Sequence, residues 1–440
     1  MTRLPALRLP RCLLDPRAAL PCADAEGLVA VSLEHHEGRI SAIRPVPAAQ
    51  CEGAPLALTP LVDAHVHLDK AWSASAFPNP PGTMEGALAA NLLEIEARTP
   101  EQVAARAERA LERAWRQGCR ALRSHVDSLG PAASGGWEVL QELRRRWAGR
   151  VELQPVALAP LLHWATPEGE ALARRVAADG GLLGGVVGPP FARRSYDPER
   201  LRTLLRLADR LGCGIDLHID ESDRDPALGL RRLVGLLEHE PIAVPITCSH
   251  ASSLALLREG PLARLAERMA ALGLSVVALP LTNLWLLGKR QGQTPLRRPQ
   301  APVSQLQAAG VVVAMASDNV ADPWYPGGDF DPLELLRLAP VLSQLSPWKR
   351  LGLAPFCSGA ARLLHLEWDG VLREGGPADL VVLGCGSWGE LLARTPARRV
   401  LRNGCWLPPP VSADEAMAPF LASLAAADPN PALRSLPVVP

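Results

Sequence analysis

Short apolar runs that end in histidine or aspartate recur along this chain, and they constrain its fold more than any other feature. The first run, residues 61–64, leads into His65-Val66-His67. In an extended strand, residues two apart point to the same face, so His65 and His67 can converge on one cation. Similar runs end at His125, His218, His250 and Asp318. Such residues meet where the carboxyl ends of parallel barrel strands form one rim. Alone, the His65-Val66-His67 pattern is equally compatible with an exposed edge strand.

Eight candidate strands alternate with helical segments through the middle of the chain. The strands are expected near 61–66, 120–126, 152–158, 182–187, 214–219, 244–249, 274–279 and 311–316. The segments 100–117 and 198–211 have amphipathic spacing and begin with proline, as helices do. No GxGxxG motif follows the first strand, which argues against an open dinucleotide-binding sheet. The sequence predicts an α/β fold, a (β/α)8 TIM barrel.

The two ends of the chain have a different texture, with short apolar stretches separated by turn residues. Segments 1–59 and 368–410 both look hairpin-rich, and Asn403-Gly404 is a strong turn signal. We expect these two segments to form a small β-sandwich domain, with the metal-dependent hydrolase barrel spanning 60–367. Residues 411–440 form a Pro/Ala-rich C-terminal tail, which is expected to be loosely ordered and is assigned no function.

Composition narrows the classes of partner. The 440 residues carry a formal net charge of +0, so no basic field attracts nucleic acid. No apolar run approaches the ~18 residues that a membrane span requires. The nine cysteines are scattered without a CxxC pair, which favours a reducing compartment. We therefore expect a cytoplasmic protein with a small-molecule substrate and no nucleic-acid or membrane partner.

Four of the strand-end residues form a plausible ligand set for one divalent metal ion. Imidazole and carboxylate groups suit Zn²⁺ or Fe²⁺, and the sequence leaves the choice between them open. The predicted ligands are His65, His67, His218 and Asp318. A bound metal lowers the pKa of water toward ~7 and so supplies hydroxide at neutral pH. His250 and Asp318 are then placed to orient that hydroxide and accept its proton.

Glu221 follows His218 by three residues and is predicted to shuttle the proton. Its alternative role is a solvated carboxylate in a loop that also contains Asp220, Asp223 and Asp225. The candidate strands 152–158 and 182–187 contain no lysine that could bridge two metals, so a single ion is predicted. The HxE and PCxxC signature of the zinc deaminases that act on nucleobases is also missing.

Six motifs in order give the chain a family resemblance from about residue 61 to residue 383. They are Asp63-Ala64-His65-Val66-His67-Leu68-Asp69, Ser124-His125-Val126-Asp127, Asp216-Leu217-His218-Ile219-Asp220-Glu221, Ser249-His250-Ala251, Pro280-Leu281-Thr282-Asn283 and the segment 317–327. The chain resembles the cytosine deaminase branch of the metal-dependent amidohydrolase superfamily. The resemblance implies a barrel with a β-sandwich, one metal on the four ligands named above, Glu221 and His250 as the acid/base pair, and a possible homo-oligomer.

The resemblance also implies the reaction. Family members deaminate nitrogen heterocycles hydrolytically, with metal-bound hydroxide attacking the ring carbon that bears the amino group. Trp324 matches the residue that borders the substrate ring, although a buried core tryptophan is an equal alternative. Two positions depart from the family pattern: Pro160 stands where cytosine deaminases carry a glutamine, and Asn319 stands where they carry a second aspartate. Asn319, Asn283 and His163 are predicted to contact the substrate.

Three functions remain open at this point. The first is a hydrolytic deaminase of an aminated heterocycle, for which Pro160 argues against cytosine itself. The second is an amidohydrolase that cleaves an N-alkylamino group or a cyclic amide, with a triazine- or hydantoin-type substrate. The third is a non-catalytic ligand-binding barrel, which has no physical need for a complete set of ligands and acid/base groups.

Overall fold

Eight parallel strands form the central barrel of the protein, and they follow one another in sequence order. The computed structural model describes residues 1–189, 196–290 and 292–408. The barrel strands are β5 (Leu61–Val66), β6 (Cys119–Asp127), β7 (Glu152–Leu158), β8 (Leu182–Val187), β9 (Ile215–Ile219), β10 (Ile246–His250), β11 (Ser275–Ala278) and β12 (Val312–Met315). A bridge between Val66 and Asp318, with the Asp318 amide donating to the His65 carbonyl at 2.9 Å, brings the two edges together. The predicted (β/α)8 barrel is confirmed.

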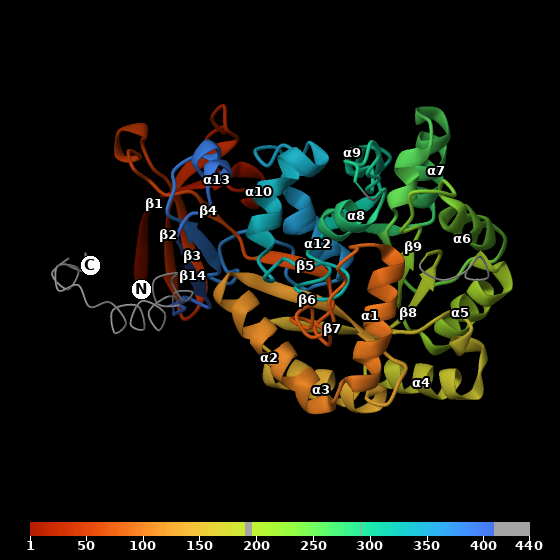
Figure 1. The fold of residues 1–440 in the computed structure, drawn as a ribbon. Coiled ribbons are helices and arrows are strands. Elements are labelled where there is room, and N and C mark those ends of the chain that lie inside the picture. Colours follow the sequence, from red (N-terminus) through yellow and green to blue (C-terminus); the bar gives the residue numbers. More distant parts are fainter. Residues whose placement is uncertain (190–195, 291, 409–440) are drawn as a thin grey trace, which may run out of the picture.

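Helices surround the barrel strands (Figure 1). They are α1 (Met84–Ala97), α2 (Pro100–Arg116), α3 (Ala133–Arg146), α4 (Pro167–Ala178), α5 (Pro198–Leu211), α6 (Leu228–His239), α7 (Glu259–Ala271), α8 (Pro280–Leu286), α9 (Val303–Ala308), α10 (Pro332–Ser343), α11 (Arg350–Leu353) and α12 (Ser358–Leu363). Two of them illustrate the sequence signals. Thr99 and Gln102 form a capping box ahead of α2, and α5 ends at Gly212, whose φ of 63° is left-handed.

Two antiparallel sheets from the chain ends pack beside the barrel (Figure 1). One sheet contains β1 (Thr2–Pro10), β2 (Leu28–His36) and β3 (Arg39–Pro45). The other contains β4 (Ala57–Leu58), β13 (Leu380–Leu383), β14 (Arg398–Arg402) and β15 (Cys405–Trp406). Side chains of both sheets, among them Leu9, Val31, Leu380 and Leu401, share one apolar core. The helix α13 (Trp388–Ala393) lies between β13 and β14 in the chain.

The turn predicted at Asn403-Gly404 is present in the structure. Asn403 and Gly404 have φ values of 49° and 72° and join β14 to β15 in a tight hairpin. The two ends therefore form the predicted additional β-structure, while the exact residues at which the domains begin and end stay predictions. The predicted tail, 411–440, lies outside the described residues.

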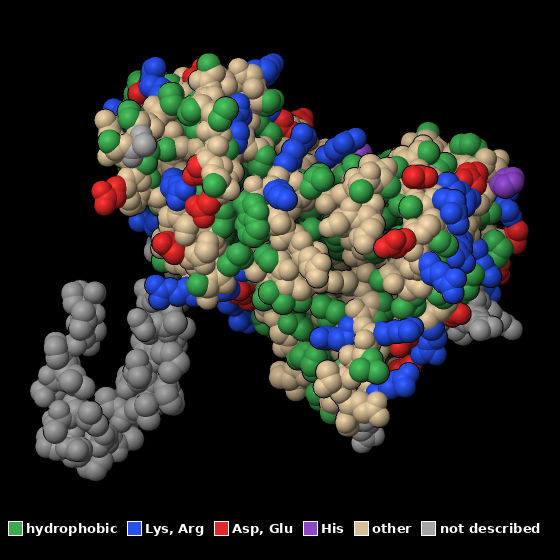
Figure 2. Space-filling model, turned by 90° about the horizontal axis from the view of Figure 1, so that it is seen from above, with side chains coloured by type: hydrophobic (Ala, Val, Ile, Leu, Met, Phe, Trp, Pro, Cys, Tyr) green, Lys and Arg blue, Asp and Glu red, His purple; other side chains and the backbone are tan. Residues whose placement is uncertain are grey.

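The described helices and the face shown in Figure 2 bear on two classes of partner, a bilayer and a polyanion. None of the described helices combines the length and the apolarity that a bilayer crossing demands. On the face shown in Figure 2, basic and acidic side chains are interspersed among apolar and neutral ones. The nine cysteines all lie in the described part of the chain, and none is in a disulfide. A cytoplasmic location stays a prediction.

Candidate active site

The carboxyl ends of β5, β9 and β12 bring the four predicted ligands together. Asp318 Oδ1 lies 3.3 Å from His67 Nε2 and 3.5 Å from His65 Nε2. His67 Nε2 lies 3.4 Å from His218 Nε2. All four side chains are buried. Asp318 adopts a left-handed φ of 63°, a backbone state that residues with a Cβ seldom adopt and that often marks a functional position.

His125 is a further member of this group. Its ring stacks on that of His65 with 3.9 Å between centroids. Potential ligand atoms of His65, His125 and His218 lie within 4.8 Å of one another, as do those of His65, His67 and Asp318. We call these five residues (His65, His67, His125, His218 and Asp318) the histidine cluster. Two overlapping donor groups therefore share His65.

The histidine cluster fits a divalent cation. His65 Nε2 and both carboxylate oxygens of Asp318 are buried, and they form no hydrogen bond with any residue that the structure describes. Burial and the neighbouring histidines hold the pKa values of His65 and His218 well below their usual range, so both rings keep their lone pairs. Donor atoms 3.3–3.5 Å apart match the edge of about 3.4 Å in a tetrahedron built on ~2.1 Å metal–ligand bonds.

A buried chain of polar groups orients His65 from behind. His65 Nδ1 lies 2.8 Å from Ser249 Oγ, and Ser249 donates to Asp216 Oδ1 at 2.7 Å. Arg123 donates to the other oxygen of Asp216 at 2.9 Å. Because Ser249 gives its proton to Asp216, it accepts from His65, which leaves Nε2 as the free lone pair. The sequence does not reveal this relay, since its members lie on four different strands.

Glu221 and His250 form a second buried pair beside the histidine cluster. Glu221 Oε1 lies 3.4 Å from His250 Nδ1, and Asn283 Nδ2 lies 3.2 Å from Glu221 Oε1 and 2.9 Å from His250 Nδ1. Ser252 donates to Asn283 Oδ1 at 2.6 Å, which fixes the amide with its nitrogen toward the pair. His250 Nδ1 is therefore an acceptor, and the ring proton lies on Nε2.

Burial shifts the proton affinities of this pair in opposite directions. It raises the pKa of Glu221 well above its usual range, with the Asp318 charge adding to the shift and Asn283 opposing it. It lowers the pKa of His250 to about 4, although the charge of Asp318 opposes the shift. Glu221 therefore holds a proton more readily than an ordinary carboxylate, and His250 is neutral at pH 7. Neighbouring groups with pKa values pushed apart are typical of acid/base sites.

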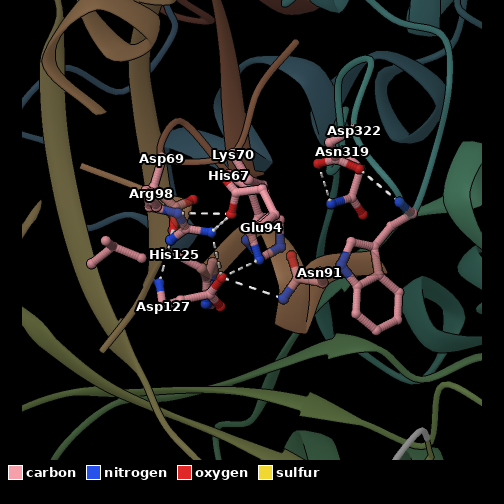
Figure 3. A network of polar contacts seen from close by, with 12 residues as sticks. His67, Asp69, Lys70, Asn91, Glu94, Arg98, His125, Asp127, Asn319 and Asp322 are labelled. Atoms are coloured by element: carbon pink, nitrogen blue, oxygen red, sulfur yellow. Dashed lines mark hydrogen bonds and ion pairs between the residues drawn. The ribbon is translucent and has the colours of Figure 1, made fainter. Parts of the chain in front are cut away.

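A cavity of about 250 Å³ opens onto both groups of residues. His67, His218 and Asp318 line it together with Glu221 and His250. Trp324 and Asn319 also line it, and their contact with a substrate stays a prediction. Asp322 organises this part of the wall, because it accepts from Asn319 Nδ2 at 2.8 Å and from the Trp324 amide at 2.8 Å (Figure 3).

Two predicted substrate contacts lie elsewhere. Asn283 is fully buried behind Glu221 and His250 and is not among the residues that line the cavity. His163 lies in a short 3-10 helix, is also absent from the described cavity wall, and faces the ring of Trp164. Trp164 is a core residue whose Nε1 donates to the Gly184 carbonyl at 2.9 Å. The structure thus gives Asn283 a positioning contact and gives His163 none with the cavity.

The surroundings of Glu221 distinguish its predicted role as a proton shuttle from the alternative of a solvated loop carboxylate. Asp220 Oδ1 and Oδ2 accept from the amides of Gly229 and Leu230, both at 2.8 Å, and so cap the start of α6. Asp223 is half-exposed, whereas Glu221 is buried in the cavity wall. Glu221 therefore does not belong to a solvated loop.

Several cavity residues were not predicted as site residues. Lys70 lines the cavity and pairs with Asp127 at 2.8 Å, and Asn91 from α1 lies against the same carboxylate. Asp127 falls in one of the quoted motifs and Lys70 directly follows another, so their proximity to His67 and His125 in the sequence was an available signal. The sequence contains no such signal for Asn91, because the apolar residues of α1 are spread around the helix and define no clear polar face.

A (β/α)8 barrel with a buried group of imidazole and carboxylate donors at its carboxyl rim defines a class of metal-dependent hydrolases. Residues 82–406 match the model of the amidohydrolase family. The chain belongs to that family, and the resemblance predicted from its motifs is confirmed. Amidohydrolases cleave carbon–nitrogen bonds by hydrolysis, so this chain is an enzyme of that class.

Individual relatives agree with the family assignment. A pterin deaminase of Rhizobium rhizogenes is 34% identical over 392 residues, which cover 86% of this chain and 88% of the relative. An N-isopropylammelide isopropyl amidohydrolase of Pseudomonas sp. strain ADP is 28% identical over 73% of this chain and 78% of the relative. The crystal structure of 5-methylcytosine deaminase from Klebsiella pneumoniae with 5-fluorocytosine superposes with a TM-score of 0.79 at 25% identity, covering 93% of this chain and 98% of that one.

Proposed function

We propose that the protein is a metal-dependent deaminase that converts an aminated nitrogen heterocycle into the corresponding oxo compound and ammonia. One observation carries the proposal: Glu221 and His250, with pKa values shifted apart, line the same cavity as a donor cluster that fits a cation. The relative that deaminates pterin supports this reaction class. The metal would be held by His65, His67, His218 and Asp318, with His125 adjacent, and zinc or iron both suit these ligands.

The bound cation would supply Lewis acidity that makes water nucleophilic at neutral pH. Glu221 accepts a proton from the attacking water and returns a proton to the departing amino nitrogen. The carbon–nitrogen bond breaks and ammonia leaves, while the second proton of the water moves from the new hydroxyl to the adjacent ring nitrogen, so the ring carbon becomes a carbonyl. His250, neutral with its proton on Nε2, donates a hydrogen bond to the oxygen that adds to the ring. Asn283 keeps both side chains in place through its amide nitrogen.

Pro160 shapes the choice of substrate in this proposal. It lines the cavity at the position where cytosine deaminases present a glutamine, and it offers no side-chain donor or acceptor. A heterocycle that depends on that amide for recognition loses a hydrogen bond here. Cytosine is therefore expected to be a poor substrate, and a pterin-type substrate is favoured by the relative with 34% identity.

Ammonia release by the metal-loaded protein tests the proposal across cytosine, isocytosine, creatinine, aminotriazines and pterins. Turnover of a pterin or another amino heterocycle, lost on chelation and restored by metal, is the expected result. The second candidate is hydrolysis of an N-alkylamino group, which the N-isopropylammelide hydrolase relative favours. Release of isopropylamine from an N-isopropylaminotriazine, with no ammonia from any amino heterocycle, would establish that alternative.

A further inference from the structure

A part of the cavity wall that the mechanism leaves unused contains Lys70, Asn91 and Asp127. Lys70 Nζ lies 2.8 Å from Asp127 Oδ2, and Asn91 Nδ2 lies 3.5 Å from the same oxygen (Figure 3). Lys70 and Asn91 are 2% and 5% exposed, so neither is a mobile surface group. An ammonium and an amide are thus held side by side on one carboxylate, within the cavity that holds the histidine cluster.

Both side chains keep hydrogen-bonding capacity that the described residues do not use. A lysine ammonium has three N–H donors, and Asp127 is the single described partner of Lys70. Asn91 turns its nitrogen toward Asp127, because a carboxylate only accepts, and this orientation leaves its oxygen as the free group. Asn91 Oδ1 is buried and forms no hydrogen bond within the described residues. The wall therefore presents one donor and one acceptor.

A network of ion pairs holds this donor–acceptor pair in place. Arg98 contacts Asp127 Oδ2 at 3.0 Å and Asp69 Oδ2 at 2.6 Å, and the Asp127 amide donates to Asp69 at 2.9 Å. Arg98 also pairs with Glu94, which Arg106 contacts at 2.6 Å. We call Asp69, Lys70, Glu94, Arg98, Arg106 and Asp127 the ion-pair network. Its buried charges fix Asp127, and Asp127 in turn fixes Lys70 and Asn91.

The electrostatic balance keeps Lys70 charged. Burial alone would lower its pKa, but the carboxylates of Asp127 and Asp69 outweigh burial and raise it. A cationic donor binds a carbonyl oxygen more strongly than a neutral donor does.

We propose that Lys70 and Asn91 bind the lactam edge of the substrate, with Lys70 donating to a ring carbonyl and Asn91 Oδ1 accepting from the adjacent ring N–H. The inference rests on the proposed function and narrows it to amino heterocycles that carry an –NH–C(=O)– unit next to the carbon that loses its amino group. Lys70 and Asn91 supply the hydrogen bonds to the substrate that the side chain of Pro160 cannot form.

The rest of the cavity indicates what the lactam ring is joined to. Leu88, Leu92 and Ile95 of α1, together with Leu129, form an apolar section of the wall. A second fused ring buries apolar surface there, whereas a single small ring leaves this section empty. A bicyclic 2-amino-4-oxo heterocycle of the pteridine type satisfies both sections of the cavity.

Product-type ligands test the inference without turnover. The probes are 2,4-dioxopteridine and its 3-methyl derivative, which lacks the N–H beside the 4-carbonyl, and the measurement is the Kd of each on the metal-loaded protein. The wild type should prefer the N–H ligand by ~10–100-fold, since the methyl group leaves Asn91 Oδ1 unpaired. Asn91→Leu should remove that preference. Lys70→Met should weaken both ligands by ~10–100-fold, because both keep the carbonyl.

Leu93→Ala is the matched control, since Leu93 lies on the same helix and is 65% exposed. Its two Kd values should equal those of the wild type, and metal content and the thermal midpoint verify that each variant is folded. The wild-type preference needs no variant, so it decides the question even if Lys70→Met fails to fold.

Equal affinity of the wild type for the two probes, or binding of neither, overturns the inference. Equal rates of ammonia release from 2-amino-4-oxopteridine and its 3-methyl derivative would overturn it while sustaining the proposed function. Selective binding of the N–H probe without ammonia release from any amino heterocycle would sustain the inference and overturn the proposed function.

Discussion

The two polar regions of the cavity wall differ in how fully their atoms are paired. In the histidine cluster, His65 Nε2 and both oxygens of Asp318 have no hydrogen bond among the described residues. In the ion-pair network, Lys70 and Arg98 each contact carboxylates at 2.6–3.0 Å. An unpaired buried polar atom costs about 1–3 kcal/mol, so it persists where a ligand uses it. The comparison separates a region whose free lone pairs can receive a cation from a region whose charges pair with one another and hold Lys70 and Asn91 in place.

Removing a carboxylate from the histidine cluster should have the largest effect. Asp318→Ala is expected to lose metal and at least about 1,000-fold of activity together, because the cation and its Lewis acidity depend on this ligand. Metal analysis and ammonia release measure the two losses. Asp329→Ala is the control, since Asp329 is half-buried and its one ion pair among the described residues is a long 3.5 Å contact with Arg113. Full metal content in Asp318→Ala would remove Asp318 from the ligand set.

Breaking the ion-pair network should instead reduce stability. Arg98→Met leaves the carboxylates of Asp69, Glu94 and Asp127 buried without their shared partner, which costs about 3–5 kcal/mol. Urea denaturation of the wild type and the variant measures the change. Arg116→Met is the matched control, because Arg116 pairs with Glu112 on the exposed face of α2, and it should cost less than about 1 kcal/mol. Equal small losses in the two variants would mean that the network contributes no rigidity.

Changing the acid/base group should separate catalysis from metal binding. Glu221→Gln keeps the side-chain shape but cannot carry the proton, so activity should fall at least ~100-fold with metal retained. Asp223→Asn, in the same loop but half-exposed, should leave activity unchanged. Retained activity in Glu221→Gln would contradict the proton-shuttle role.

Asn283 should show the smallest effect, and its kinetic pattern distinguishes two roles. Asn283→Leu removes the amide that positions Glu221 and His250, so kcat should fall about 10-fold with KM nearly unchanged. A predicted substrate contact would raise KM instead. The pH profile of kcat/KM adds a second readout, because the variant removes the Asn283 hydrogen bond that opposes the rise in the Glu221 pKa. That pKa should therefore rise further in the variant.

The barrel strands were predictable because strands buried on both faces appear in a sequence as continuous apolar runs. Predicted segments such as 152–158 and 182–187 coincide with β7 and β8. The hairpin turn at Asn403-Gly404 was also predictable, because it needs two left-handed residues in a row. Strands and turns of this kind depend on neighbouring residues, so they can be predicted from the sequence.

The candidate site was predictable only where its chemistry is local. The two-residue spacing of His65 and His67 and the three-residue spacing of His218 and Glu221 indicated their grouping. The ion-pair network was not visible, since Arg98 is 29 residues from both Asp69 and Asp127 and the three meet only in the folded chain. The motif that contains Asn283 gives no information about which neighbour its amide faces. Its contact with Glu221 and His250 was therefore not predicted.

Metal-dependent ammonia release tests the central claim most directly. The measurement is ammonia formed from 2-amino-4-oxopteridine by chelator-treated protein before and after titration with Zn²⁺ or Fe²⁺, with metal content determined at each point. We expect activity to rise in proportion to metal and to reach its maximum at one ion per chain. Activity that is independent of metal, a requirement for two ions, or an absence of ammonia from every amino heterocycle would contradict a mononuclear deaminase.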